Sequence, residues 1–160
     1  MNKKTRNRKI IFIIIMISID QLSKIVVINN SFNIGIISFE VEEKTKIKFM
    51  EVLFSMLTDI AIFTIIIKFI KEQNKNMNRN IRFSLELVLS GGISNLIDKI
   101  WNGNVLTFIK IAKLPIINFA YILIFIGWIS FLIFMAKDTI KIKDKIKSIN
   151  QNKGEKNWER

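Results

Sequence analysis

Three carboxylates interrupt long apolar stretches of this sequence. Asp20, Asp59 and Asp98 each lie among residues that are mostly Ile, Leu, Val and Phe. A charge at the centre of a bilayer costs about 2.5–3.5 kcal/mol on insertion scales, so such residues usually face a partner or a cavity. Two carboxylates held together can act as general acid and general base, because like-charge proximity separates their pKa values. The three acids are therefore the first candidates for chemistry.

Ion pairing is the alternative explanation for these acids. Lys24 follows Asp20 by four residues, so the two side chains share one helix face. Asp98 has Lys99 beside it and Asn95 three residues before it. Pairs of this kind would only orient helices. Asp59 has no basic residue near it in the sequence, so both interpretations stay open for this residue.

The run from Gly91 to Lys99 is polar within an apolar segment. Asn95 and Asp98 share a helix face, and Gly91 lies one turn further back on it. The glycines let a second backbone approach, and the polar side chains then need partners because unpaired polar groups in hydrocarbon are costly. This run predicts a tightly packed junction between helices.

Several kinds of catalysis are excluded by composition. The chain contains no Cys and no His. Disulfides, Ser-His and Cys-His catalysis and the usual zinc ligands are therefore all ruled out. We expect neither a metal site nor a cofactor, and acid–base chemistry would have to come from carboxylates, Lys or Tyr.

Four apolar blocks provide the elements that would position these residues. Each is about as long as the roughly 20 residues that span a bilayer as a helix. The blocks cover residues 10–28, 52–70, 83–101 and 117–136. They predict an all-α membrane protein with four transmembrane helices in a single integral membrane domain over residues 1–160. The three acids then map to the outer half of the helix bundle.

The placement of charge predicts the topology. The net charge is +12, and basic residues concentrate before the first block, between the second and third blocks, and after the fourth. By the positive-inside rule both termini are cytoplasmic, and this distribution argues against nucleic-acid binding. Ile142, Ile146 and Ile149 recur at helical spacing among lysines in the basic tail 137–160, which favours a helix on an anionic membrane surface. No small-residue cleavage site follows the first block, so we expect that helix to be retained.

The outer segments alternate between polar and apolar residues. Alternation on both sides of residues 43–45 predicts a β-hairpin that turns there, within the segment Asn29–Glu51. Alternation from Val105 to Ile111 predicts a further strand beside that hairpin. Together they would form a small extracytoplasmic β-cradle.

Four motifs in order make the sequence resemble the lipoprotein signal peptidase (signal peptidase II) family. They are Asp20-Gln21-Leu22-Ser23-Lys24, the run Gly91 through Lys99, Val105-Leu106-Thr107-Phe108, and Asn118-Phe119-Ala120-Tyr121. The resemblance covers most of residues 10–136. It implies four transmembrane helices in the bacterial cytoplasmic membrane, both termini inside, and an intramembrane aspartic peptidase that processes prolipoproteins.

The sequence departs from the family where the chemistry is expected. The resemblance puts the catalytic Asp pair at positions that here hold Thr107 and Tyr121. A Thr hydroxyl is not a base, and a phenol with a pKa near 10 is mostly protonated at neutral pH. The family's Asn-x-Gly-x-Ala-Phe segment is also missing from Phe49–Ser55. Lys99 replaces the Arg of the third-helix motif.

Three hypotheses follow from these departures. The first is a non-catalytic family member, a pseudoenzyme, that binds a lipoprotein or transmembrane segment in a groove between the helices and the outer hairpin. Its support shell would be Asp20, Lys24, Asn95, Asp98, Lys99 and Asn118. The second is an active peptidase that uses Asp20, Asp59 and Asp98 as displaced acids. The third is an ion or proton pathway through the same acids. Membrane lipid is the expected environment in each case, and the sequence does not predict an oligomeric state.

Overall fold

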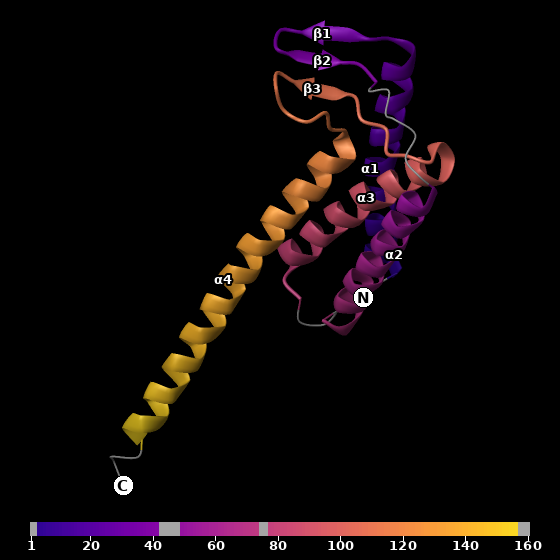
Figure 1. Cartoon of the computed structure of the whole chain (residues 1–160). Coiled ribbons are helices and arrows are strands. Elements are labelled where there is room, and N and C mark those ends of the chain that lie inside the picture. The colour runs from indigo at the N-terminus through magenta and orange to yellow at the C-terminus, as the bar shows by residue number, and fades with distance from the viewer. Residues whose placement is uncertain (1–2, 42–48, 74–76, 157–160) are drawn as a thin grey trace.

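Four long helices and three short strands make up the computed structural model, which describes residues 3–41, 49–73 and 77–156 (Figure 1). The helices are α1 (Lys3–Asn29), α2 (Phe49–Glu72), α3 (Arg79–Asn102) and α4 (Phe119–Lys156). The strands are β1 (Phe32–Ile34), β2 (Ile37–Phe39) and β3 (Ile109–Ile111). Each predicted apolar block falls on one helix. The start of α1 and the end of α4 both lie away from the sheet, and α4 projects well beyond the other helices (Figure 1).

Three of the four helices are long and apolar enough to cross a membrane within the described residues. The candidate spans are Asn7–Asn29, Met50–Glu72 and Phe119–Ser148. Helix α3 does not qualify, so the prediction of four spans holds only for α1, α2 and α4. The reason is that α3 is the central helix, packed against the other three. Much of its polar surface is buried against protein, which permits a less apolar sequence than a lipid-facing helix needs.

Glycines allow α3 to approach its neighbours, as the run from Gly91 predicts. A Cβ atom on Gly91 would lie 2.4 Å from the carbonyl oxygen of Ala120 in α4. A Cβ atom on Gly92 would lie 2.5 Å from the ring of Phe63 in α2. Both distances are shorter than atoms tolerate, so α3 needs glycine at these positions to contact α2 and α4 simultaneously.

The strands form an antiparallel sheet in the order β1-β2-β3. Phe32 pairs with Phe39 across the first hairpin, and Phe39 pairs with Ile109 of β3. The predicted strand in Val105–Ile111 is thus confirmed at β3. The described hairpin turns at Gly35, which has a φ of +61°. The turn predicted at residues 43–45 lies outside the described residues.

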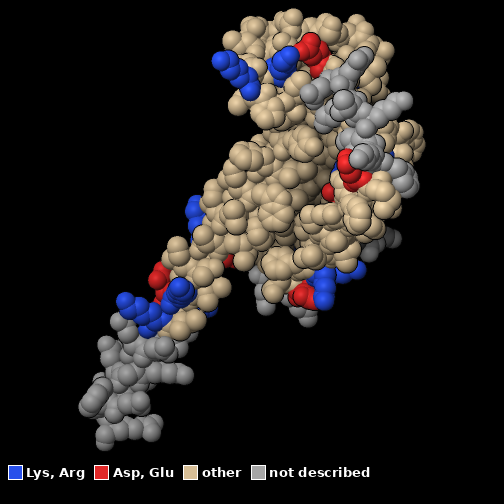
Figure 2. Space-filling view, in the orientation of Figure 1, with Lys and Arg blue, Asp and Glu red and all other residues tan. Residues whose placement is uncertain are grey.

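The sheet packs on one end of the helix bundle through an apolar cluster. Val27 of α1, Phe108 and Ile109 are buried there. At the other end, α4 continues as a helix through Lys156, well beyond its predicted apolar block. Lysine side chains gather on the described part of α4 farthest from the sheet (Figure 2). Contact of this extension with a membrane surface stays a prediction.

Candidate functional site

A buried polar cluster joins α1, α3 and α4 near the sheet. At its centre Asp20 is fully buried, and its Oδ1 atom accepts a hydrogen bond of 2.8 Å from the backbone N–H of Ala120. Its Oδ2 atom accepts from the Ser94 hydroxyl at 2.7 Å and pairs with Lys24. Because Ala120 lies in the first turn of α4, the carboxylate is held at the positive end of that helix.

Lys24 bridges two carboxylates. Its Nζ atom contacts Asp20 and also lies 2.7 Å from Oδ2 of Asp98. Asp98 additionally accepts from Nε2 of Gln21 at 3.0 Å and from the backbone N–H of Leu106 at 3.1 Å. The predicted Asp20–Lys24 pair is confirmed. The main partner of Asp98 is Lys24, whereas the sequence suggested its neighbours on α3, because a contact between two helices leaves no signature in local spacing.

The cluster carries more negative than positive charge. Two carboxylates share one ammonium group, and all three side chains are at most 3% exposed. Neutral N–H and O–H donors from Gln21, Ser94, Leu106 and Ala120 offset the excess. Such charge-assisted hydrogen bonds are stronger than neutral ones. The arrangement therefore supplies every accepting oxygen of both acids with a donor.

Asn118 completes the cluster and starts α4. Its Oδ1 atom accepts from the backbone N–H of Tyr121 at 2.8 Å, as an N-cap side chain does. Its Nδ2 atom donates at 2.9 Å to Oδ1 of Asn95 and to the carbonyl of Leu106. Among the described residues, every buried side-chain nitrogen and oxygen has a partner. The predicted support residues Asp20, Lys24, Asn95, Asp98 and Asn118 are thus one connected network.

Asp59 pairs with Lys99, which joins α2 to α3. The distance from Nζ to Oδ2 is 2.5 Å, and the two side chains are 13% (Lys99) and 25% (Asp59) exposed. Sequence spacing missed this pair because 40 residues separate the partners. The predicted depth in the membrane could have indicated the pair. An acid inside a membrane needs a base at the same depth, and Lys99, like Asp59, falls in the outer part of its helix.

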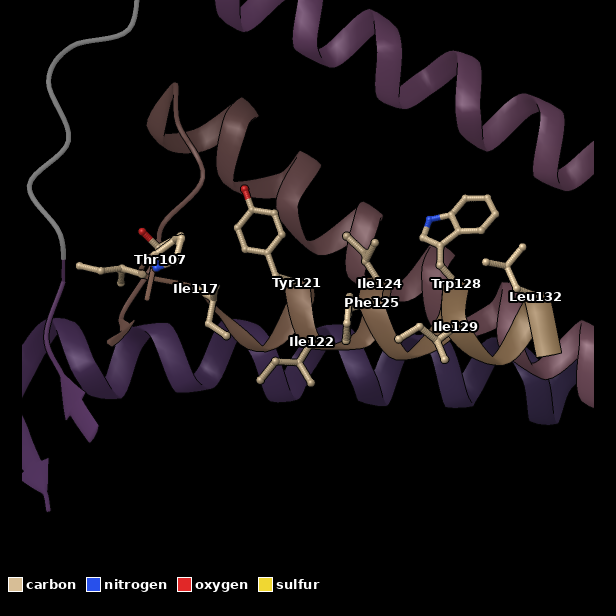
Figure 3. Close-up of a pocket in the computed structure, with 11 residues that line it drawn as sticks. Thr107, Ile117, Tyr121, Ile122, Ile124, Phe125, Trp128, Ile129 and Leu132 are labelled. Carbon is tan, nitrogen blue, oxygen red and sulfur yellow. The ribbon is translucent and has the colours of Figure 1, made fainter. Parts of the chain in front are cut away.

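Thr107 and Tyr121 lie at one end of an apolar groove along α4 (Figure 3). Its volume is about 690 Å³. Thr107 is buried and Tyr121 is partly exposed. The other lining residues are aliphatic or aromatic, apart from one proline: Pro115, Ile116, Ile117, Ile122, Ile124, Phe125, Trp128, Ile129 and Leu132.

A second apolar groove of about 430 Å³ lies between α1 and the sheet. It is lined by Ile19, Leu22, Ser23, Val26, Val27, Phe32, Phe39, Phe108 and Phe119. Phe32 and Phe39 stack at 4.5 Å between ring centroids, and Phe108 contacts Phe119 at 5.9 Å. Neither groove is lined by a carboxylate.

The acids and the apolar grooves are separate features of the described residues. Asp20 and Asp98 come close through Lys24, but both are buried and ion-paired. Asp59 is ion-paired with Lys99. Within the described ranges no cluster of three metal-ligating residues occurs. The grooves offer apolar walls, and their polar side-chain groups are the hydroxyls of Thr107, Tyr121 and Ser23 and the indole N–H of Trp128.

The model of the family "Signal peptidase (SPase) II" matches residues 12–137 of this chain, and the chain belongs to that family. Two solved structures, both described as bacterial membrane enzymes studied by the in meso method, share the fold. The structure at 2.3 Å resolution has a TM-score of 0.69 at 21% sequence identity, over 83% of this chain and 90% of its own. The structure at 1.9 Å has a TM-score of 0.68 at 20% identity, over 82% and 94%. No curated protein matches the sequence.

Proposed function

We propose that this chain is a non-catalytic member of the signal peptidase II family that binds a lipidated or transmembrane polypeptide segment in its apolar grooves. The observation that carries the proposal is the pair of side chains at the family's catalytic positions. Thr107 and Tyr121 line the α4 groove where the family resemblance puts two aspartates. A peptide bond lying in this groove would meet two hydroxyl groups and no carboxylate.

The missing pair removes the chemistry rather than weakening it. Aspartic peptidases need one carboxylate to take a proton from water and one carboxylic acid to polarise the carbonyl group. A threonine hydroxyl and a protonated phenol can donate and accept hydrogen bonds, but they do not take a proton from water at neutral pH. The Tyr121 hydroxyl, on a partly exposed side chain, is therefore suited to donate to a carbonyl oxygen of a bound segment, with no bond broken.

The shape and lining of the α4 groove suit a hydrocarbon ligand. From Tyr121 to Leu132 the lining follows one face of α4 over about 16 Å at 1.5 Å per residue. An acyl chain or an apolar helix would bury its surface along this length, at about 25 cal/mol per Å² of apolar area. The groove between α1 and the sheet gives a second apolar surface on the outer side.

The proposed location is the bacterial cytoplasmic membrane, with both termini inside. Supporting this, the beginning of α1 and the end of α4 both lie on the side of the molecule away from the sheet (Figure 1). Basic residues flank that side, in agreement with the positive-inside rule. The sheet would then lie on the outer side, where an exported lipoprotein emerges.

A peptidase that uses displaced acids has weaker support. Asp20 and Asp98 approach each other through their shared contact with Lys24. Both acids are buried, so water would have to reach them and Lys24 would have to leave before either acid acted as a base. A proton pathway has less support still, because residues 10–17 and 60–67 offer almost no polar side chain toward the cytoplasmic end.

Capture of a diacylglyceryl-modified prolipoprotein tests the proposal. The purified chain in lipid nanodiscs should retain the modified prolipoprotein intact, and retain the unmodified precursor at least tenfold less. Phe125→Asn, which places an amide in the groove, should reduce retention. Ile140→Asn, on α4 outside the groove, is the matched control. Equal retention of the modified and unmodified precursors would contradict the proposal. Equal retention of the modified precursor by the Phe125→Asn and Ile140→Asn variants would contradict it as well.

A further inference from the structure

Helix α2 is attached to the rest of the molecule along one narrow seam. Among its described residues only Ile66 is buried, and most of the others are exposed. Asp59, Phe63, Ile66 and Ile70 follow one another by three or four residues, so they form a single stripe facing α3. The two ends of this stripe differ in chemistry, and the difference assigns each end a separate role.

The end of α2 away from the sheet is held by apolar packing to two helices. Ile66 belongs to a buried cluster with Leu85, Val88 and Leu89 of α3. Phe69 packs edge-on against Phe131 of α4, with 6.2 Å between ring centroids. Packing of this kind is lost only when the helices separate, so this end serves as a fixed point.

The end of α2 nearer the sheet is held to α3 by the Asp59–Lys99 ion pair. The pair is only partly buried, since Asp59 is 25% exposed and Lys99 is 13% exposed. Met50, Leu53, Phe54 and Leu57, in the same half of α2, are exposed. An ion pair is the kind of contact that can open and re-form, because a charged group or water can replace either partner.

The ion pair is linked to the Thr107 end of the groove through a short chain of residues. Lys99 directly follows Asp98, and Asp98 accepts a hydrogen bond from the backbone of Leu106 at 3.1 Å. Leu106 directly precedes Thr107, which lines the groove. Movement of Lys99 would therefore shift Thr107, which lies at the polar end of the groove.

From these contacts we infer that Asp59 and Lys99 form a latch that holds the outer half of α2 against α3. Opening the latch lets α2 swing about its packed end at Ile66 and Phe69. The swing changes the distance between the outer half of α2 and α4, along which a membrane-embedded segment would bind. Asp59 and Lys99 are positioning residues in this account. The identity of the segment rests on the proposed function, whereas the latch itself does not.

Pairs of spin labels test the latch directly, since the chain has no native cysteine. One pair, Phe54→Cys with Ile126→Cys, reports the outer half of α2 against α4. A second pair, Ile67→Cys with Ile133→Cys, reports the packed end. All four side chains are exposed. Distances are measured in nanodiscs without any partner, in the parent chain and with Asp59→Asn or Lys99→Met added.

With either substitution, the outer distance should shift or broaden by about 2 Å or more, the scale of helix movements at interfaces. The packed-end distance should stay unchanged. Glu72→Gln, which breaks the exposed Lys68–Glu72 pair on the same helix, is the matched control and should alter neither distance. The exchanged pair Asp59→Lys with Lys99→Asp should restore the parent distance.

An unchanged outer distance in Asp59→Asn would overturn the latch, and so would equal broadening of both label pairs, which would indicate a general packing role. Failure of lipoprotein capture leaves the measured distances untouched. The two proposals therefore fail independently.

Discussion

Two neighbouring regions of this protein have kept different parts of the family pattern. The polar cluster at the junction of α1, α3 and α4 holds acids, amides and a lysine that match the family motifs, and five of them are buried: Asp20, Lys24, Asn95, Asp98 and Asn118. The lining of the α4 groove includes Ile117 and Tyr121 on either side of Asn118, and Thr107 and Tyr121 stand where the motif resemblance places the family's acids.

The contrast indicates that the buried residues that support the fold can be kept while the residues at the groove change. Each cluster residue binds a partner that would otherwise be buried without one, such as the N–H of Ala120 or the carbonyl of Leu106. Leaving such a group unsatisfied costs about 1–3 kcal/mol. Tyr121 of the groove is 39% exposed, so a change there leaves less of the fold unpaired than loss of Asp20, which is fully buried.

Removal of the lysine that serves two acids should have the largest effect. Lys24→Met leaves Asp20 and Asp98 buried without a counter-ion, and breaking a buried pair in this way costs about 3–5 kcal/mol. Denaturant unfolding in detergent measures the loss. Lys68→Met, on an exposed face of α2, should change stability by less than about 0.5 kcal/mol. Equal effects of the two variants would break the contrast between cluster and surface.

A single methyl group at Gly91 should come next in size. Gly91→Ala sets a Cβ atom 2.4 Å from the backbone oxygen of Ala120, so α3 and α4 must separate. Overpacking of this kind costs about 1–3 kcal/mol. The same unfolding measurement checks it. A variant as stable as the parent chain would mean that the helices do not pack as closely as the structure indicates.

Loss of the helix cap should have a smaller effect. Asn118→Ala removes the acceptor for the Tyr121 N–H and the donor to Asn95 and Leu106. N-cap substitutions cost about 0.5–2 kcal/mol. Asn118→Asp keeps the cap acceptor but loses the two donated bonds, so comparing the variants separates capping from the cluster. An alanine variant with unchanged stability would contradict the role assigned to Asn118.

The smallest effect is expected in the groove. Tyr121→Phe removes a hydroxyl from a partly exposed side chain and should change unfolding by less than about 0.5 kcal/mol. A loss as large as that of Lys24→Met would show that the groove carries the fold as the cluster does. The comparison between the two regions would then fail.

Much of the fold follows from the sequence because apolar length is a local signal. The blocks at 10–28 and 52–70 lie within α1 and α2, and the alternation near Ile109 identifies β3. The block at 83–101 also gives a helix, but a span cannot be assigned to α3 from composition because its polar side chains are buried by other helices.

The site was predictable only where partners lie close in the chain. Asp20 and Lys24 are four residues apart and their pairing follows from helix geometry. The contacts from Lys24 to Asp98 and from Lys99 to Asp59 depend on how helices pack, so no local pattern indicates them. The assignment of Thr107 and Tyr121 to the family's catalytic positions rests on the motif resemblance and stays a prediction.

Hydrolysis of a prolipoprotein tests the central claim most directly. The purified chain in nanodiscs is incubated with diacylglyceryl-modified prolipoprotein, and the released signal peptide is measured by mass spectrometry. The account predicts retention of the intact precursor, with no more product than in empty nanodiscs. Product formed by the parent chain and abolished by Asp59→Asn or Asp98→Asn would contradict it, because a displaced acid would then be performing the reaction.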